Sequence, residues 1–157
     1  MRYLWEAIKN RHGVLLEIGS SAGKHLRSVL ELGHGFECHG TDIDADSVKL
    51  GHRVCPLVLF SVADGHRLPY SPESFDAVVI MDYLEHVNNP RVALDEAFRV
   101  LKKNGLLCAF IPCEDNSLSV FHLFKRVFGF NVKKPAGGHV HDFRLSDVGE
   151  LLAMTIR

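Results

Sequence analysis

The chain lacks long apolar runs: none of its 157 residues belongs to a stretch approaching the ~20 apolar residues that a membrane-spanning helix needs. Its first residues, MRYLWEAIKNRH, also lack the apolar core and the small-residue cleavage site of a secretory signal. An excess of basic charge is missing as well, because the formal net charge is -1 and the sequence pI is about 6.8. Nucleic acids and anionic membranes usually select a basic protein. We therefore expect a cytoplasmic protein with no integral membrane segment and no nucleic-acid partner.

Cysteine is scarce too, and the four cysteines form no CxxC pair. Small buried hydrophobic residues in a reducing cytosol explain them better than disulfides or a zinc site. Hydrophobic residues make up 46% and charged residues 24% of the chain, which is typical of a globular protein. The length is enough for one hydrophobic core, so the sequence predicts a single domain over residues 1–157.

Short apolar runs alternate with amphipathic segments along the first two thirds of the chain. The runs predict strands over residues 14–18, 36–41, 57–62, 75–81 and 106–111. The run FDAVVIM (75–81) is β-branched and almost wholly apolar, so it predicts an inner strand buried on both faces. This alternation predicts an α/β fold: a Rossmann-like, doubly wound, mostly parallel sheet with helices on both faces.

Three helices are expected between these strands. The first covers residues 22–32 and stops at Gly33, and the second starts at an Asp44 cap and runs to about residue 52. The third starts at Asn89-Pro90 and continues through two lysines to a stop at Asn104-Gly105. Beyond residue 112 the pattern predicts a phenylalanine-rich helix over 118–130, a loop over 133–138 and a last helix over 144–154.

The first crossover, LLEIGSSAG, carries the first candidate binding site. Glycines at such a turn let a ligand approach the backbone, and the following helix N-terminus offers unpaired N–H groups. Glu17 at the strand end opposes a phosphate and favours a ligand with a cationic or hydroxyl-bearing part. The spacing does not match a nucleotide P-loop, and the GxGxxG of a dinucleotide site is missing. A tight turn that binds no ligand remains an alternative for this loop.

Two acidic residues follow the next two predicted strands. Asp42, in GTDID, lies at the distance from Gly19 expected for a carboxylate that accepts hydrogen bonds from ribose hydroxyls. Helix capping is its alternative role, which Asp44 could fill equally well. Asp64, in ADG, could accept from an exocyclic amine while a neighbouring N–H donates to a ring nitrogen, which together would recognise adenine. A solvated turn is the alternative there.

Taken in order, LLEIGSSAG, GTDID, VADGHRLPYSPESFDAVVIMDYLEHV and RVLKKNGLL resemble the motifs of class I S-adenosylmethionine (SAM)-dependent methyltransferases. The resemblance is greatest to the subgroup of ubiquinone and menaquinone biosynthesis methyltransferases. It implies SAM as the cofactor, held by residues that follow successive strands: Glu17, Gly19, Ser21, Gly23, Asp42, Ile43, Asp64, Gly65, Met81 and Asp82.

The resemblance also implies a division of roles among these residues. The loop from Glu17 to Gly23 would border the methionine part, Asp42 would bind the ribose, and Ile43, Asp64 and Gly65 would surround the adenine. Met81 and Asp82 would lie under the sulfonium, and Tyr83 and His86 would lie near the cofactor or the substrate mouth.

The chain departs from the family pattern in two ways. Ser21 stands where the family usually has its middle glycine, and we expect this small residue to be a tolerated variant that, if its backbone angles are ordinary, could also donate a hydrogen bond. The family fold usually continues into two further strands, whereas this sequence stops at Arg157. The resulting sheet edge is expected to be open and apolar, which would favour a homo-oligomer or a partner that covers it.

The expected reaction is transfer of a methyl group from SAM to a small-molecule acceptor. A general base is needed only for a poor nucleophile such as a hydroxyl, and the candidates are His86, His139 and His141. A metal site at His139, His141 and Asp142 is disfavoured because no further ligand is signalled.

Residues 112–143 lie where the family usually has a substrate-covering insertion. The phenylalanines there would suit an apolar, quinone-like or aromatic acceptor, although core packing or an interface would also explain them. Two rival functions stay open at this point: a SAM-binding subunit without turnover, and an NAD-linked or nucleotide-sugar Rossmann enzyme.

Overall fold

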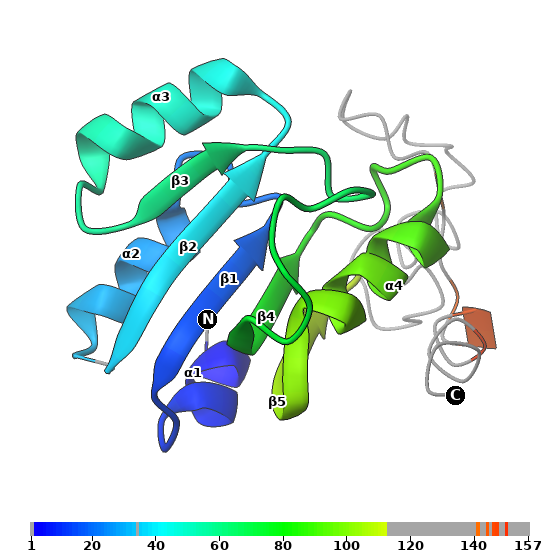
Figure 1. Cartoon of the computed structure of the whole chain (residues 1–157), viewed down its shortest axis with the longest axis horizontal. Helices are drawn as coiled ribbons and strands as arrows, with labels where there is room; N and C mark the ends of the chain where they lie inside the picture. Colours follow the sequence, from blue (N-terminus) through cyan, green and yellow to red (C-terminus); the bar gives the residue numbers. More distant parts are fainter. Residues whose placement is uncertain are drawn as a thin grey trace, which may run out of the picture.

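The computed structural model describes residues 2–33, 35–112 and the single positions 141, 144, 146, 147 and 150. Its centre is a five-stranded parallel sheet in the order β3-β2-β1-β4-β5 (Figure 1). The strands are β1 (Gly13–Ile18), β2 (Phe36–Asp42), β3 (Leu59–Val62), β4 (Phe75–Met81) and β5 (Leu101–Phe110). The strand order reverses between β1 and β4, and ligands of open α/β sheets bind at such a switch point.

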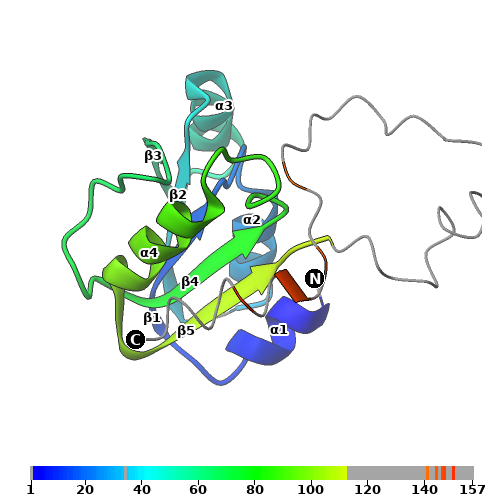
Figure 2. The same ribbon diagram turned by 90° about the vertical axis from the view of Figure 1, so that its right-hand side faces the viewer.

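Helices cover both faces of this sheet. The helices are α1 (Arg2–Ile8), α2 (Lys24–Glu31), α3 (Ala45–Val54) and α4 (Pro90–Val100). α4 lies on one face, and α1 and α2 lie on the other (Figures 1 and 2). α3 packs with α1 and α2, since buried side chains of all three belong to one core cluster. The predicted doubly wound α/β fold is confirmed, whereas α1 was not expected from the sequence.

Adjacent residues of β1 divide the core between the two faces. Leu15 packs into the cluster with α1–α3, and Leu16 packs into the cluster with α4; both are fully buried. β4 lies between β1 and β5 and repeats this division, with Val78 on the α4 side and Val79 on the other. The prediction of an inner strand over 75–81 is therefore confirmed.

The predicted helix starts at Asp44 and Asn89 are also confirmed. The Asp44 side chain accepts from the backbone N–H groups of Asp46 and Ser47, and the Asn89 side chain accepts from that of Val92. Each cap satisfies backbone donors that the first helical turn leaves open.

Several predicted boundaries were wrong for identifiable reasons. α2 starts at Lys24, two residues late, because Gly23 takes a left-handed φ of 80° and cannot continue a helix backward. α4 ends at Val100, not at Asn104-Gly105, because Leu101 is already extended and starts β5. Lys102 then binds the Asp76 carboxylate of β4 at 2.9 Å, so it stabilises the sheet and not the helix end. For its part, β3 starts at Leu59, two residues after the predicted 57.

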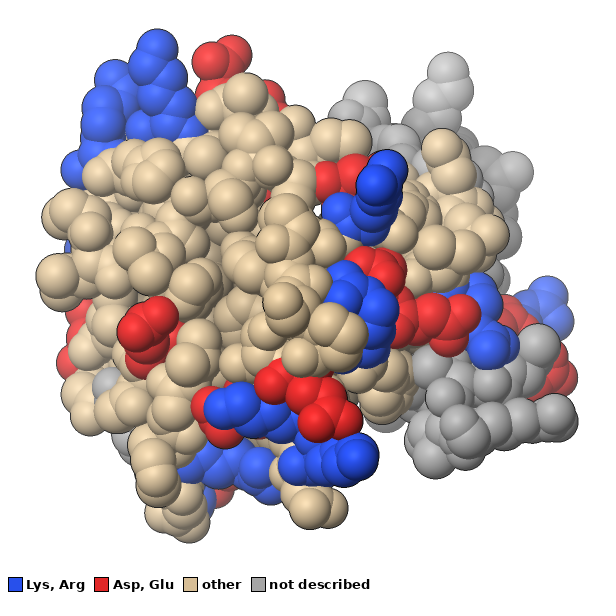
Figure 3. Space-filling model, viewed as in Figure 1, with Lys and Arg blue, Asp and Glu red and all other residues tan. Residues whose placement is uncertain are grey.

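α4 carries its charged side chains as ion pairs on its outer side. Arg91 pairs with Asp95, and Arg99 pairs with Glu96. In the space-filling view, basic and acidic side chains accordingly lie next to one another over α4 (Figure 3).

The predicted elements over 118–130 and 133–138 lie outside the described residues, as does most of the helix predicted over 144–154. The suggested insertion over 112–143 is described only at Pro112 and His141. Within the described part of the chain, no helix is long and apolar enough to cross a bilayer.

Candidate functional site

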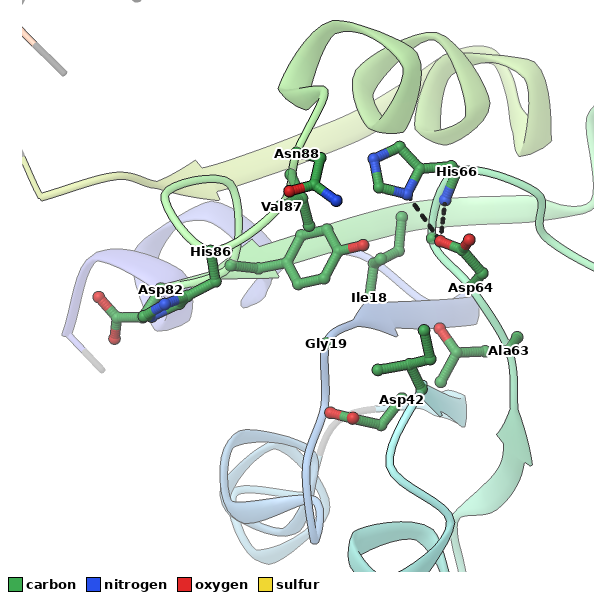
Figure 4. A pocket seen from close by; sticks show the side chains of 14 residues that line it. Ile18, Gly19, Asp42, Ala63, Asp64, His66, Asp82, His86, Val87 and Asn88 are labelled. Carbon is green, nitrogen blue, oxygen red and sulfur yellow. Dashed lines mark hydrogen bonds and ion pairs between the residues drawn. The ribbon is translucent and has the colours of Figure 1, made fainter. Parts of the chain in front are cut away.

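A cleft of about 420 Å³ opens at the carboxyl ends of the strands, where β1 and β4 diverge (Figure 4). Its size is within the usual range for small-molecule sites. Its walls contain eight of the residues singled out from the sequence: Gly19, Asp42, Ile43, Asp64, Gly65, Asp82, Tyr83 and His86. These residues come from the ends of β1, β2 and β4 and from the loop after β3, so the fold gathers segments up to 67 positions apart into one site.

The loop after β1 has an unusual backbone. Gly19, Ser21 and Gly23 all take left-handed φ angles, of 73°, 48° and 80°. Ser21 therefore does not meet the condition of ordinary backbone angles. A left-handed φ costs a residue with a Cβ about 1–2 kcal/mol. This conformation allows the Ser21 N–H to donate to Oδ2 of Asp42 at 2.8 Å, which ties the loop to the end of β2.

Asp42 is held by backbone donors on both carboxylate oxygens. Oδ2 accepts from Ser21, and Oδ1 accepts from the N–H of Asp44 at 3.0 Å. The helix cap is Asp44, so the alternative capping role for Asp42 does not apply. A carboxylate fixed in this way keeps lone pairs for further donors, as recognition of two ribose hydroxyls would require.

Asp64 shares the cleft wall with a histidine that the sequence interpretation overlooked. Its Oδ1 accepts from the backbone N–H of His66 at 2.9 Å and lies 2.7 Å from Nδ1 of the same residue (Figure 4). These contacts, the backbone hydrogen bond first, lower the pKa of Asp64. The other oxygen, Oδ2, accepts no hydrogen bond from the described residues. A histidine two positions after an acid at a strand end was the signal in the sequence.

Tyr83 lies across the cleft between two glycines. A Cβ added at Gly19 would come within 2.4 Å of its Cδ2, and one added at Gly65 within 2.2 Å of its Oη. Burial, and then the charges of Asp64 and Asp42, raise the pKa of Tyr83 to about 12. Both glycines thus make room for this ring, in addition to any ligand that approaches them.

Glu17 is the most deeply buried acid of the predicted set, with 1% of its surface exposed, and it does not line the cleft. Its Oε1 lies 2.7 Å from Nδ1 of His25 on α2, whereas Oε2 has no hydrogen-bond partner among the described residues. Burial raises the pKa of Glu17, and the hydrogen bond with Glu17 raises the pKa of His25. The pair therefore holds a proton more tightly than an isolated imidazole does. His25 was not singled out from the sequence.

Two of the three candidate general bases, His86 and His141, lie at or beside the cleft. His86 lines the cleft, and His141 lies against the same turn, since its N–H donates to the carbonyl of Glu85 and its Nε2 to that of Asn88. His139 lies outside the described residues, and so does Asp142. Among described residues, no group of three His, Cys, Asp or Glu side chains is arranged to hold a metal ion.

Met81 is half-buried and packs against the cluster with α1–α3, so it supports the cleft from below without lining it. Asp82, the next residue, turns into the cleft with a left-handed φ of 49°.

The charge of the cleft restricts its ligands. Three carboxylates, Asp42, Asp64 and Asp82, line it, and its described lining contains no Lys or Arg. A diphosphate would meet repulsion there without a compensating cation. A ligand with hydroxyls, amines and positive charge fits this lining.

Comparisons with known proteins agree with this geometry. A family model described as Methyltransferase domain matches residues 16–109. Demethylmenaquinone methyltransferase of Renibacterium salmoninarum is 38% identical over 73 residues, which are 46% of this chain and 31% of that protein. An uncharacterized protein of Methanocaldococcus jannaschii is 31% identical over 125 residues, which are 77% of this chain and 56% of that protein. The chain thus spans less than two thirds of the length of these relatives.

Among solved structures, the cyclase SpnF superposes with a TM-score of 0.74 at 23% identity. The superposition covers 98% of this chain and 54% of SpnF. At this identity the likeness shows the fold alone, since one fold can host different reactions.

Proposed function

Because this chain belongs to the class I SAM-dependent methyltransferase family, we propose that it binds SAM in the cleft between β1 and β4 and transfers its methyl group to a small molecule. The first rival function, a SAM-binding subunit without turnover, is not favoured by any observation on the described residues. The other rival, an NAD-linked or nucleotide-sugar enzyme, conflicts with the carboxylate lining and with the loop sequence.

One observation carries the proposal: the cleft gathers carboxylates at three strand ends and places a fourth, Glu17, beneath its glycine loop. SAM carries the matching groups, namely a ribose diol, an exocyclic amine, a sulfonium and an ammonium. Among the described residues, no group donates to the buried Oε2 of Glu17. A buried oxygen without a donor is costly, and the ammonium of SAM would supply the missing donor.

The roles of the residues follow from their places in the cleft. We assign Asp42 to the ribose hydroxyls, Asp64 with Gly65 and Ile43 to the adenine, and Asp82 to the neighbourhood of the sulfonium. Gly19, Ser21 and Gly23 form the loop that borders the methionine part, above Glu17. When bound, SAM supplies an electrophilic methyl carbon, so the protein contributes mainly binding and alignment.

We further propose that the acceptor is apolar or aromatic, as quinone-like molecules are. The demethylmenaquinone methyltransferase relative supports this acceptor class, and so do the phenylalanines at 121, 124, 128 and 130 in the sequence. For a hydroxyl acceptor, His86 is the candidate base with a described place in the cleft wall. His141, on the same turn, is the second candidate.

A transfer assay tests the proposal. The chain is incubated with methyl-labelled SAM and a panel of reduced naphthoquinones, catechols and, for contrast, short polar amines. We expect labelled quinol or catechol product, and far less of it with Asp42→Asn at subsaturating SAM, while Asp46→Asn on the exposed start of α3 keeps full activity. Transfer to the polar amines alone would contradict the proposed acceptor class. Formation of S-adenosylhomocysteine (SAH) without labelled product from any acceptor of the panel would also contradict the proposed acceptor class.

A further inference from the structure

A second feature of the cleft floor, the pair of Glu17 and His25, goes beyond the assignment of a cofactor. Glu17 is at the end of β1 and His25 is in the first turn of α2, so the glycine loop passes directly between them in the sequence. The 2.7 Å contact joins Oε1 and Nδ1, and the Glu17 side chain is 1% exposed against 26% for His25. His25 therefore supplies a nearby counter-charge to a carboxylate that is almost fully buried in the free protein.

Three charged residues act on this pair, from the ends of β2 and β4 and from α2. Asp42, at the end of β2, raises the pKa of Glu17 by its negative charge, and Asp82, after β4, acts on His25 in the same direction. Lys24, beside His25 on α2, is the opposing charge. Before any ligand arrives, the acids outnumber the cations here, and a proton on His25 reduces the imbalance.

We propose that His25 exchanges its positive charge with the cofactor: the imidazolium neutralises Glu17 in the free protein and loses its proton when the cofactor ammonium reaches the unpartnered Oε2. This inference rests on the proposed function, because it needs an ammonium-bearing cofactor at this loop. Two cations around one buried carboxylate repel each other at short range, where the low dielectric strengthens the repulsion. The imidazolium is the one that can discharge, because the ordinary pKa of a histidine, about 6.5, lies below that of an α-ammonium, about 7.7–8.0.

Proton release makes the binding depend on pH in a defined direction. As the free protein carries the proton and the complex does not, cofactor affinity rises with pH until His25 is neutral in the free protein. With one proton released, the dissociation constant falls by up to about tenfold per pH unit over that range. Above the range, affinity is constant.

Calorimetric titration with SAH counts the protons. The titration is repeated at pH 6, 7 and 8 in phosphate and in Tris, whose ionisation enthalpies differ, so that released protons appear as a heat difference. We expect a release approaching one proton at the pH where His25 is charged. Methylthioadenosine, which lacks the amino-acid part, is the matched ligand control and should bind without proton release.

His25→Gln keeps a donor for Glu17 and cannot titrate, so its SAH affinity should not vary with pH. His39→Gln is the control variant, because His39 makes a similar 2.8 Å contact with Glu37 outside the cleft. Equal proton release by SAH and methylthioadenosine, or by wild type and His25→Gln, would overturn the inference while leaving the cofactor assignment intact. Absence of binding by either ligand to the folded wild-type chain would overturn the proposed function itself, and the inference with it.

Discussion

Arg99 holds residues 68–70, which follow Asp64 and Gly65, against α4, and removing its guanidinium should destabilise the fold. Its Nε and Nη2 donate to the two carboxylate oxygens of Glu96 at 2.7 and 2.8 Å. Nη1 and Nη2 also donate to the carbonyls of Tyr70 and Leu68, at 2.8 and 3.1 Å. Glu96 in turn accepts from the Leu68 N–H at 2.8 Å, so one ion pair fixes three backbone groups of the neighbouring segment.

The expected magnitude follows from these four hydrogen bonds. A hydrogen bond to a charged group contributes about 1.5–3 kcal/mol, and bonds within one network are not additive. The Arg99 side chain is 33% exposed, so water replaces part of the loss in the variant. We expect Arg99→Met, which keeps the apolar stem, to lower the free energy of unfolding by about 2–3 kcal/mol. The melting temperature should fall by roughly 4–12 °C for a domain of this size.

Urea unfolding followed by circular dichroism measures this effect. Arg99→Lys should fall between wild type and Arg99→Met, because an ammonium cannot reproduce the forked geometry. Arg27→Met is the control: among the described residues the Arg27 side chain bonds only Glu31, on the exposed side of α2, and the midpoint should not move. A midpoint for Arg99→Met equal to that of Arg27→Met would refute the reasoning.

Three further outcomes are expected. Ser21→Gly should stabilise the fold by up to about 1 kcal/mol in urea unfolding, because glycine relieves the left-handed strain. The larger chain entropy of glycine in the unfolded state offsets part of this gain. A lower midpoint would argue against strain at this loop. Asp76→Asn should lower stability at pH 7 but not at pH 2. The Val14 N–H and then a lysine ammonium lower the pKa of Asp76 below 3.8. The stabilisation by the Asp76 carboxylate is therefore present above that value and lost as the pH falls through the folded pKa. A difference from wild type that stayed constant in urea unfolding down to pH 2 would contradict this. Gly65→Ala should weaken SAH binding by roughly tenfold in calorimetry, because the new Cβ displaces the Tyr83 hydroxyl. Adding Tyr83→Phe should restore part of the affinity. Unchanged SAH binding by Gly65→Ala would show that the Tyr83 ring moves aside without cost to the site.

Much of the fold could be predicted because local signals agree with it. The apolar run at 75–81, the Asp44 and Asn89 caps and the acids after successive strands each specify an element or a position by themselves. Boundaries were less predictable wherever long-range pairing decides them. Lys102 has the character of a helix C-terminus in sequence, but its bond with Asp76, 26 positions away, belongs to the sheet.

The site was predictable to the extent that it follows strand ends. Asp42, Asp64 and Asp82 meet in the cleft because parallel strands end at one edge of the sheet. His25 and His66 were less accessible, since their importance comes from side-chain contacts with Glu17 and Asp64 that no periodic pattern records. The left-handed angle of Ser21 escaped prediction for a related reason, because a bond to Asp42, 21 positions away, stabilises it.

The central claim, that this cleft binds a SAM-type cofactor through Asp42, is tested most directly by calorimetric titration with SAH and with NAD. We predict that the wild-type chain binds SAH and not NAD, and that Asp42→Asn weakens SAH binding by about 10- to 100-fold through loss of charge-assisted hydrogen bonds. Binding of NAD in preference to SAH, or unchanged SAH binding by Asp42→Asn, would contradict the account.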